Sequence, residues 1–193
     1  PDENVMVPTV DVVSLPIDFD QLEGSYAAKV TALNNEPAFQ YVLASLCVTY
    51  ADLGHKVLFV SDRIAMLEAL KDRLGDKAVL YHSSLSKNEK DAALSKMRSG
   101  KASILLGSLR IFLEGISENY LSCLVLGASI SGPPLEQVIG RVIRQREGKE
   151  NPIIVDVLPA GRTMKRHHED RLKTYAKADY SINYYREDES TTV

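Results

Sequence analysis

Apolar residues recur along this chain with two alternating periods from residue 37 onward. Stretches in which they return every third or fourth residue are typical of helices that bury one face, and the short β-branched runs between them are typical of buried strands. Because strands that alternate with helices build parallel sheets, we predict one α/β domain with helices on both faces of a parallel sheet. The predicted helices cover about 37–53, 64–74, 87–99 and 135–146, and the predicted strands 57–60, 78–81, 104–106, 124–126 and 153–155.

Cap and turn residues mark the ends of these helices. Pro37 opens the first one, since proline is favoured in a first helical turn. Ser86 and Glu89 have the spacing of a capping box at the start of the third. Glycines are expected to stop three helices, at Gly54, Gly75 and Gly100.

The pattern divides the chain into three parts. Residues 1–36 are expected to form an N-terminal extension, residues 37–160 the main domain, and residues 161–193 a basic C-terminal helix with a polar tail. This leaves the repeated strand–helix pattern in one central domain of ordinary size.

The N-terminal extension contains one short run of strand character. Val10–Val13 is predicted to be an edge strand, because Pro8 and Pro16 interrupt it and proline cannot donate a hydrogen bond inside a sheet. Asn34-Asn35 is predicted to be a loop.

Composition bounds the class of protein. With 193 residues, 45% of them hydrophobic and 25% charged, the chain can bury one sizeable core without a metal or a disulfide. Cys47 and Cys123 stand inside apolar runs, where we expect small buried thiols. No apolar stretch reaches the ~20 residues of a membrane span, and no signal peptide opens the chain. We therefore expect no membrane contact and a reducing, cytoplasmic setting.

The net charge of −3 gives no general reason to expect nucleic-acid binding, but the charge is unevenly placed. Residues 141–177 hold ten Lys and Arg against five Asp and Glu, so this stretch carries +5 and the remainder −8. A local basic face and an ordinary mixed surface are both open interpretations.

The basic stretch around residues 162–177 also has two interpretations. Its cations and tyrosines could extend a surface that tracks a nucleic-acid strand, or the helix could pack through Leu172 and Tyr175. The run His167-His168-Glu169-Asp170 within it is predicted to be solvated surface, and adjacent histidines without a cysteine do not indicate zinc. No metal site is predicted.

The predicted helix 135–146 has two distinct faces. Leu135, Val138, Ile139, Val142 and Ile143 fall in one apolar band at 100° per residue. The opposite face, about 100° wide, holds the polar set Gln137, Gly140, Arg141 and Arg144.

Two arginines beside a glycine make a good receptor for a phosphate group. Each guanidinium presents a planar fork to tetrahedral oxygens, and glycine lets a ligand approach closely. Glycine within a helix costs ~1 kcal/mol relative to alanine, so Gly140 calls for a reason. From spacing alone, a solvated amphipathic helix with surface arginines remains an equally open interpretation.

The arginine-bearing run resembles the last conserved motif of superfamily 2 helicases, Gln-x-x-Gly-Arg-x-x-Arg, at residues 137–144. Neighbouring segments are similar to other parts of the family in the right order, and together they cover about residues 40–158. They include Val57–Ser61, Tyr81-His82 and Ser108–Ser117. A Gly-Lys loop and an Ile-Val-Asp strand after the motif look closest to the DNA-repair and phage branch-migration group of DNA helicases.

The resemblance implies the second, C-terminal RecA-like domain of a motor that binds ATP between two such domains. Arg141 and Arg144 would be arginine fingers to the γ-phosphate, where such a group can be worth ~10³–10⁵ in rate. Gln137 would position the fingers or the nucleotide, and Gly140 would permit the close approach.

The resemblance also implies contacts near residues 108–117. Gly115 and Ser117 would lie at the nucleotide, although Ser117 stands where many relatives have an aspartate, which puts that role in doubt. Glu114 replaces an arginine of the RNA-helicase branch and favours DNA over RNA as the partner.

Four further residues are expected at the nucleic-acid backbone by the same resemblance. Ser108 stands where the family has threonine and keeps the hydroxyl that would bind a phosphate. The others are Ser61, Arg63 and His82.

The chain lacks a Gly-x-x-x-x-Gly-Lys-[Ser/Thr] loop, so it cannot cradle a triphosphate unaided. ATP with Mg is therefore expected to bind mainly to an N-terminal RecA-like domain of the same protein, and this segment alone is expected to be inactive. A catalytically dead docking module is the second hypothesis. A dinucleotide enzyme on a doubly wound sheet is the third, but the Gly-rich turn that it needs is missing.

Overall fold

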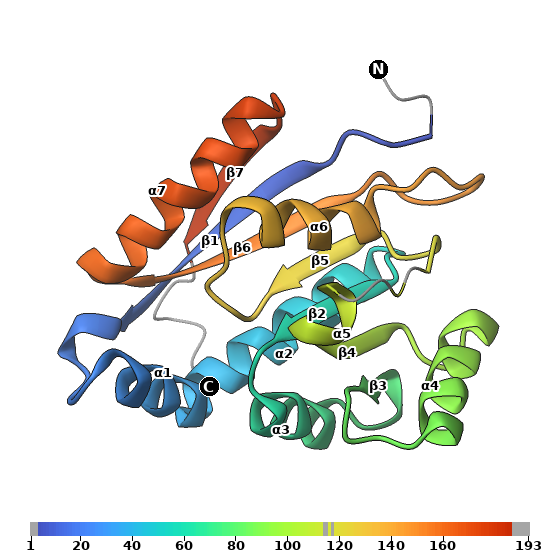
Figure 1. Cartoon of the computed structure of the whole chain (residues 1–193), viewed down its shortest axis with the longest axis horizontal. Coiled ribbons are helices and arrows are strands. Elements are labelled where there is room, and N and C mark those ends of the chain that lie inside the picture. Colours follow the sequence, from blue (N-terminus) through green and yellow to red (C-terminus); the bar gives the residue numbers. More distant parts are fainter. Residues whose placement is uncertain (1–3, 114–115, 117, 187–193) are drawn as a thin grey trace.

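Seven parallel strands form one sheet in the computed structural model, which describes residues 4–113, 116 and 118–186 (Figure 1). Their order across the sheet is β3-β4-β2-β5-β6-β1-β7. The strands are β1 (Thr9–Asp18), β2 (Val57–Ser61), β3 (Ala78–Tyr81), β4 (Ile104–Ser108), β5 (Cys123–Leu126), β6 (Ile153–Ala160) and β7 (Ser181–Arg186).

Helices cover both faces of this sheet, as predicted. They are α1 (Tyr26–Asn35), α2 (Pro37–Asp52), α3 (Ile64–Leu74), α4 (Lys87–Ser99), α5 (Leu109–Leu113), α6 (Gly132–Val142) and α7 (Arg162–Lys177), with 3-10 turns at Phe19–Gln21 and Gly75–Lys77. Ser86 and Glu89 form the predicted capping box of α4, and Gly100 ends that helix in the left-handed conformation.

Side chains alternate between the two faces along each strand, which gives the protein two cores. In β2, Val57 and Phe59 join α2 and α3 in one core, whereas Leu58 and Val60 join α4, α5 and α6 in the other. Because both faces of the sheet are covered, its central strands are buried throughout and consist of apolar runs.

The N-terminal strand is longer than predicted and is not an edge strand. β1 lies between β6 and β7 and pairs in parallel with both (Figure 1). Pro16 is tolerated because the pairing with β7 stops at Ser14 and the register with β6 shifts between Leu15 and Asp18. β7 was missed in the sequence because it is the outer strand and most of its residues are exposed.

The predicted loop at Asn34-Asn35 is the end of helix α1. Ser25 caps this helix, with its hydroxyl accepting a hydrogen bond from the Ala28 amide at 3.2 Å. The helix buries only Leu33, so it lacks the apolar stripe that periodicity can detect. It ends at Asn35 because Pro37 starts α2.

Both cysteines are buried free thiols, as predicted. Burial raises the pKa of Cys47 to about 12 and holds that of Cys123 well above its ordinary value. Within the described ranges, no helix has the length and apolar character needed to cross a membrane.

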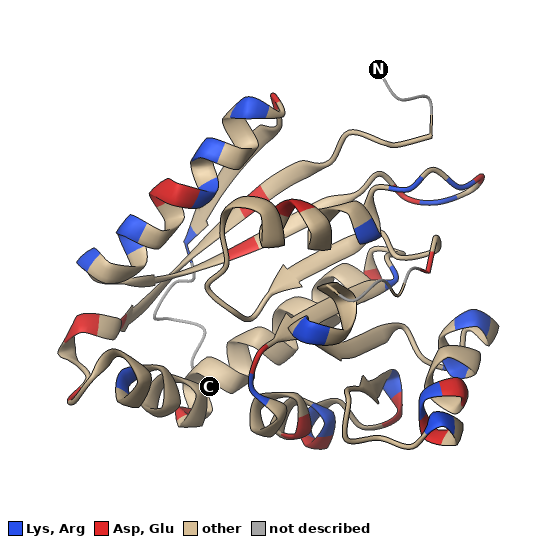
Figure 2. Cartoon of the chain, in the orientation of Figure 1, with Lys and Arg blue, Asp and Glu red and all other residues tan. Residues whose placement is uncertain are grey.

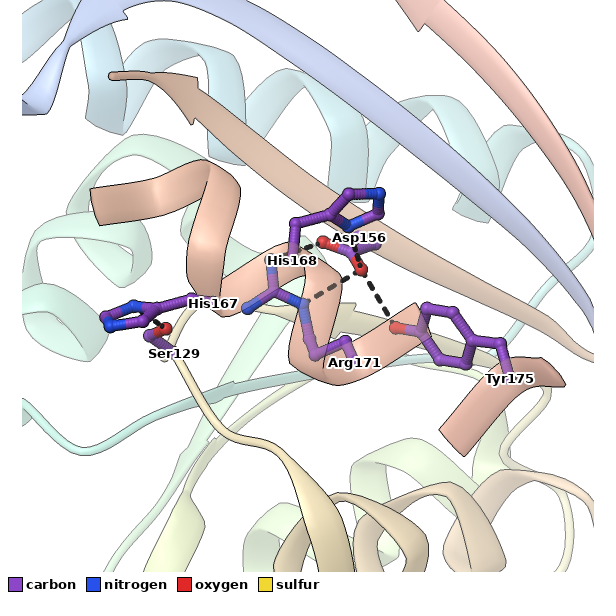
Figure 3. A network of polar contacts seen from close by, with 6 residues as sticks. All are labelled: Ser129, Asp156, His167, His168, Arg171 and Tyr175. Carbon is purple, nitrogen blue, oxygen red and sulfur yellow. Dashed lines mark hydrogen bonds and ion pairs between the residues drawn. The ribbon is translucent and has the colours of Figure 1, made fainter. Parts of the chain in front are cut away.

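A buried carboxylate anchors α7 to the sheet (Figure 3). Asp156 in β6 accepts two hydrogen bonds from Arg171, from Nε at 2.9 Å and from Nη2 at 2.8 Å. It also accepts one from the Tyr175 hydroxyl at 2.9 Å and contacts His168 Nδ1 at 3.2 Å. The prediction that His168 lies on a solvated surface is therefore wrong, and Arg171 does not extend a basic surface. Both turn inward because the uncompensated charge of Asp156 would be costly to bury.

The network keeps Asp156 ionised although the residue is fully buried. Burial alone would raise the pKa of Asp156, but hydrogen bonds from His168 and Arg171 and the charge of Arg171 outweigh burial and lower it. A depressed pKa in the folded state contributes stability that is complete above the unfolded-state pKa. This contribution is lost as the pH falls through the folded-state pKa.

Replacing Asp156 with asparagine should lower the free energy of unfolding by about 3–5 kcal/mol, because it leaves the Arg171 guanidinium buried without its counter-charge. Urea unfolding of the two proteins measures this difference. Lys173→Ala is the matched control on the same helix, since Lys173 pairs with Asp170 at an exposed position and should change stability by less than about 0.5 kcal/mol. Equal stability of the Asp156→Asn variant and the wild type would contradict the anchoring role.

Candidate functional site

Helix α6 is amphipathic, as the sequence predicts. Pro133 and Pro134 lie in its first turn, and its buried face carries Leu135, Val138, Ile139 and Val142. On the other side, Gln137 is exposed, and Gly140 and Arg141 are half-buried. The polar face is therefore directed away from the core.

The helix is shorter than predicted, and Arg144 does not belong to it. α6 ends at Val142, and Arg144 forms an antiparallel bridge with Val5. The Met6 amide donates to the Ile143 carbonyl at 2.7 Å, and the Gln145 amide donates to the Asn4 carbonyl at 3.1 Å. These contacts with the N-terminal segment replace the helical bonds, so Arg141 and Arg144 come from a helix and from the extended segment that follows it.

Lys149 closes the end of α6, a role that the sequence analysis did not assign. Its ammonium donates to the carbonyls of Val142 at 2.7 Å and Arg144 at 2.6 Å, where a helix leaves carbonyls without partners. Burial, assisted by the charge of Arg146, lowers the pKa of Lys149 to about 8. The position of a basic residue shortly after a predicted helix was the sequence signal that could have predicted this capping role.

The orientation of Arg141 is fixed from one side. Its Nε donates to the Phe112 carbonyl at the end of α5, at 3.0 Å, and its terminal nitrogens make no hydrogen bond to the described residues. Partial burial and the charge of Arg144 lower the pKa of Arg141. Two guanidiniums that repel each other in this way are stabilised by an anion placed between them.

Gly140 borders an open hollow that is lined by Arg144 but not by Arg141. A Cβ at position 140 would meet nothing within 4 Å, so no neighbour in the described structure requires a glycine there. Arg144 and Arg146 line the same hollow, and Figure 2 shows Lys and Arg residues at the end of α6 and on the loop after it. The arrangement fits a phosphate-bearing ligand that approaches the helix closely.

A second group of predicted residues lies at the carboxyl ends of the strands. Ser61 in β2 and Ser108 in β4 are register partners, and His82 follows the last residue of β3, the strand next to β4. All three are buried. His82 Nδ1 and Ser108 Oγ are buried and have no hydrogen-bond partner within the described part of the chain, so each keeps an unused hydrogen-bonding group.

Ser61 and Arg63 already have partners. The Ser61 hydroxyl accepts from the Arg63 amide at 3.1 Å, and the Arg63 guanidinium donates to the Thr31 hydroxyl at 2.8 Å. Arg63 is half-buried and lines a cavity. Gly115 and Ser117, predicted at the nucleotide, lie outside the described residues, as does Glu114.

The predicted site residues thus fall into two groups at opposite ends of the parallel strands. Helix α6 starts at the carboxyl end of β5 and runs antiparallel to the strands. Arg141 and Arg144 therefore lie toward the amino ends of the strands. Ser61, His82 and Ser108 lie at the edge where the strands end. This separation suits a domain that contacts a nucleotide on one side and a polymer on the other.

Comparison with known protein families identifies the family to which this fold belongs. The family described as "Helicase conserved C-terminal domain" matches residues 40–146, more than half of the chain. The chain belongs to this family. The predicted resemblance to superfamily 2 helicases and the RecA-like fold of this helicase C-terminal domain are confirmed.

Two related proteins are also named as helicases. "Probable helicase D10" of Escherichia phage T5 is 32% identical over 180 residues, which is 91% of this helicase C-terminal domain and 40% of the phage protein. "Putative ATP-dependent RNA helicase L396" of Acanthamoeba polyphaga mimivirus is 28% identical over 69% of this chain and 26% of its own length. The chain therefore spans less than half of each relative.

A solved structure shares the fold. The crystal structure of T4 UvsW superposes with a TM-score of 0.71 at 17% identity, covering 93% of this helicase C-terminal domain and 41% of the T4 chain. At this identity the likeness extends to the fold alone. The superposition extends beyond residues 40–146, because these make up little more than half of the chain.

Gly140→Ala should raise the free energy of unfolding of this domain by about 0.5–1 kcal/mol, because alanine favours a helix and its Cβ meets no neighbour. Gly107→Ala is the contrasting control in β4. There a Cβ would lie 2.1 Å from the Phe112 ring, so stability should fall. Chemical unfolding of both variants checks the pair, and a loss of stability in Gly140→Ala would show that the glycine has a structural role.

Proposed function

We propose that this domain is the second motor domain of an ATP-dependent DNA helicase or translocase that unwinds or remodels DNA by branch migration. The observation that carries the proposal is the fixed orientation of Arg141. Its Nε is held by the Phe112 carbonyl, the charge of Arg144 lowers its pKa, and the preceding residue, Gly140, has open space where a side chain would stand. ATP with Mg would be held mainly by an N-terminal RecA-like domain of the same protein.

Arg141 and Arg144 are proposed as arginine fingers. Charge spreads over the γ-phosphate oxygens in the transition state of phosphoryl transfer, and a positioned guanidinium stabilises that charge. Gln137, exposed one turn before Arg141, would position the finger or the nucleotide. Gly115 and Ser117 are kept as proposed nucleotide contacts on the family resemblance alone.

Ser61, Arg63, His82 and Ser108 are proposed to hold the nucleic-acid backbone. Hydroxyls, imidazoles and guanidiniums are groups that commonly bind phosphate oxygens. The unpartnered atoms of His82 and Ser108 support this role, because buried polar groups without partners are costly unless a ligand completes them. We propose DNA as the polymer, because the residues after Arg144 resemble those of the DNA-repair and phage branch-migration helicases. The mimivirus relative is named as an RNA helicase, so RNA is the alternative polymer that the experiment should compare with DNA.

The second candidate is a docking module without catalytic function. It is favoured by the lack of a phosphate-cradling Gly-Lys loop anywhere in the sequence. In that case Arg141 and Arg144 would contribute to a surface and not to chemistry.

Arg141→Ala in the intact protein should lower the turnover number of DNA-stimulated ATP hydrolysis by about 10³–10⁵ while ATP binding is retained, because the variant loses stabilisation of the transferring phosphoryl group. Steady-state hydrolysis with single-stranded DNA or RNA measures both the rate and the preferred polymer. Arg73→Ala is the matched control, since Arg73 is exposed on α3, donates to Gln40 and belongs to neither group of predicted site residues. An unchanged rate in Arg141→Ala would overturn the finger and favour the docking module.

A further inference from the structure

A small cavity opens at the carboxyl ends of β2, β5 and β6, next to the proposed backbone site. Its volume is about 170 Å³. Asp62 and Arg63, which directly follow Ser61, lie on one side of it, and helix α1 lies on the other. None of the family motifs in the sequence assigns a ligand to this cavity.

The topology of the sheet creates the cavity. Helix α3 leaves β2 on one face of the sheet, whereas α6 leaves the neighbouring β5 on the opposite face. Open parallel sheets bind ligands in the crevice where adjacent strands send their helices to opposite sides. Helix α1 covers this crevice and closes it into a pocket.

Apolar and polar side chains both line the cavity. Its polar residues include Arg171 and Asn34 besides Asp62, Arg63 and Ser129. The apolar part is formed by Leu33, Phe39, Leu126, Val157 and Met164. Arg171 is 4% exposed, and its Nε and Nη2 are held by Asp156, so Nη1 has donors for the cavity (Figure 3). Asn34 Oδ1 is a buried acceptor without a partner among the described residues.

An aromatic residue stands at the mouth. Tyr26, at the start of α1, is 49% exposed, and its ring packs edge-on against His167 at 5.7 Å between centroids. The Ser129 hydroxyl holds His167 Nδ1 at 2.6 Å (Figure 3). The exposed face of Tyr26 is thus a supported stacking surface beside the cavity.

The charges at the cavity disfavour a phosphate as its occupant. The negative charge of Asp62 offsets the positive charge of Arg63 at the wall, and Asp156 compensates that of Arg171, so the lining has no net positive charge for a phosphate. A neutral planar group with polar edges suits this lining better than an anion does. The volume is similar to that of an engineered cavity of ~150 Å³ that takes up benzene, so one ring fits.

We propose that this cavity takes up one single-ring nucleobase of the bound strand, with Tyr26 as the stacking platform at its mouth. The proposal rests on the proposed function, because it requires a strand on Ser61, His82 and Ser108. Arg63 stands between the phosphate contacts and the cavity, where the backbone would pass as the base turns in. Base stacking on an aromatic side chain tolerates different sequences, which suits a motor that moves along DNA.

The test is the affinity of the intact protein for single-stranded oligothymidine in which one abasic residue is moved along the strand. We expect one position at which the missing base weakens binding about ten- to a hundredfold, measured by fluorescence anisotropy. Tyr26→Ala should remove this sensitivity and Tyr26→Phe should keep it. Tyr41→Ala is the matched control, because Tyr41 is 50% exposed on α2 and does not line the cavity.

The outcomes separate this proposal from the proposed function. Binding that weakens with salt but is equally strong for every abasic position would overturn the base site and leave the backbone contacts in place. Full positional sensitivity in Tyr26→Ala, with an unchanged thermal midpoint, would also overturn the role of Tyr26. If no variant and no wild-type protein binds the strand at any salt concentration, both proposals fail.

Discussion

Parallel pairing of all seven strands is the constraint on which the rest of the structure depends. The carboxyl ends of parallel strands all lie on the same side of the sheet. Each connecting helix must therefore return to the side of the amino ends before the next strand can begin. This brings Ser61, His82 and Ser108 together from three strands that are far apart in the sequence. Parallel pairing also places the end of α6, with Arg141, on the side of the sheet where the strands start.

The arginine region depends on contacts between distant parts of the chain. Arg141 is oriented by a carbonyl of α5, and the segment of Arg144 is held between the bridge to Val5 and the ammonium of Lys149. Contacts from three segments thus position this region before any ligand arrives, and preorganisation of this kind is what the proposed arginine-finger role would require.

The outer part of the sheet has a different role. Asp156 fixes α7 through Arg171 and Tyr175, and Asp20 caps the start of the same helix by accepting from the Thr163 hydroxyl at 2.7 Å. With α7 held in place, His167 supports Tyr26. Residues outside the segment matched by the family therefore contribute much of the wall of the cavity at the carboxyl ends of the strands.

The sequence by itself determined the α/β class, the central strands, the helices with strong apolar stripes and the family motif that contains Arg141. These features are local, because they depend on periodicity, caps and the order of residues along a few turns. Only the tertiary structure decided that α6 stops at Val142, that β1 is an inner strand, and that His168 and Arg171 turn inward to Asp156. Each of these depends on a partner more than ten residues away in sequence, namely the N-terminal segment, the strand β7 or a buried carboxylate, and no local pattern records such a partner.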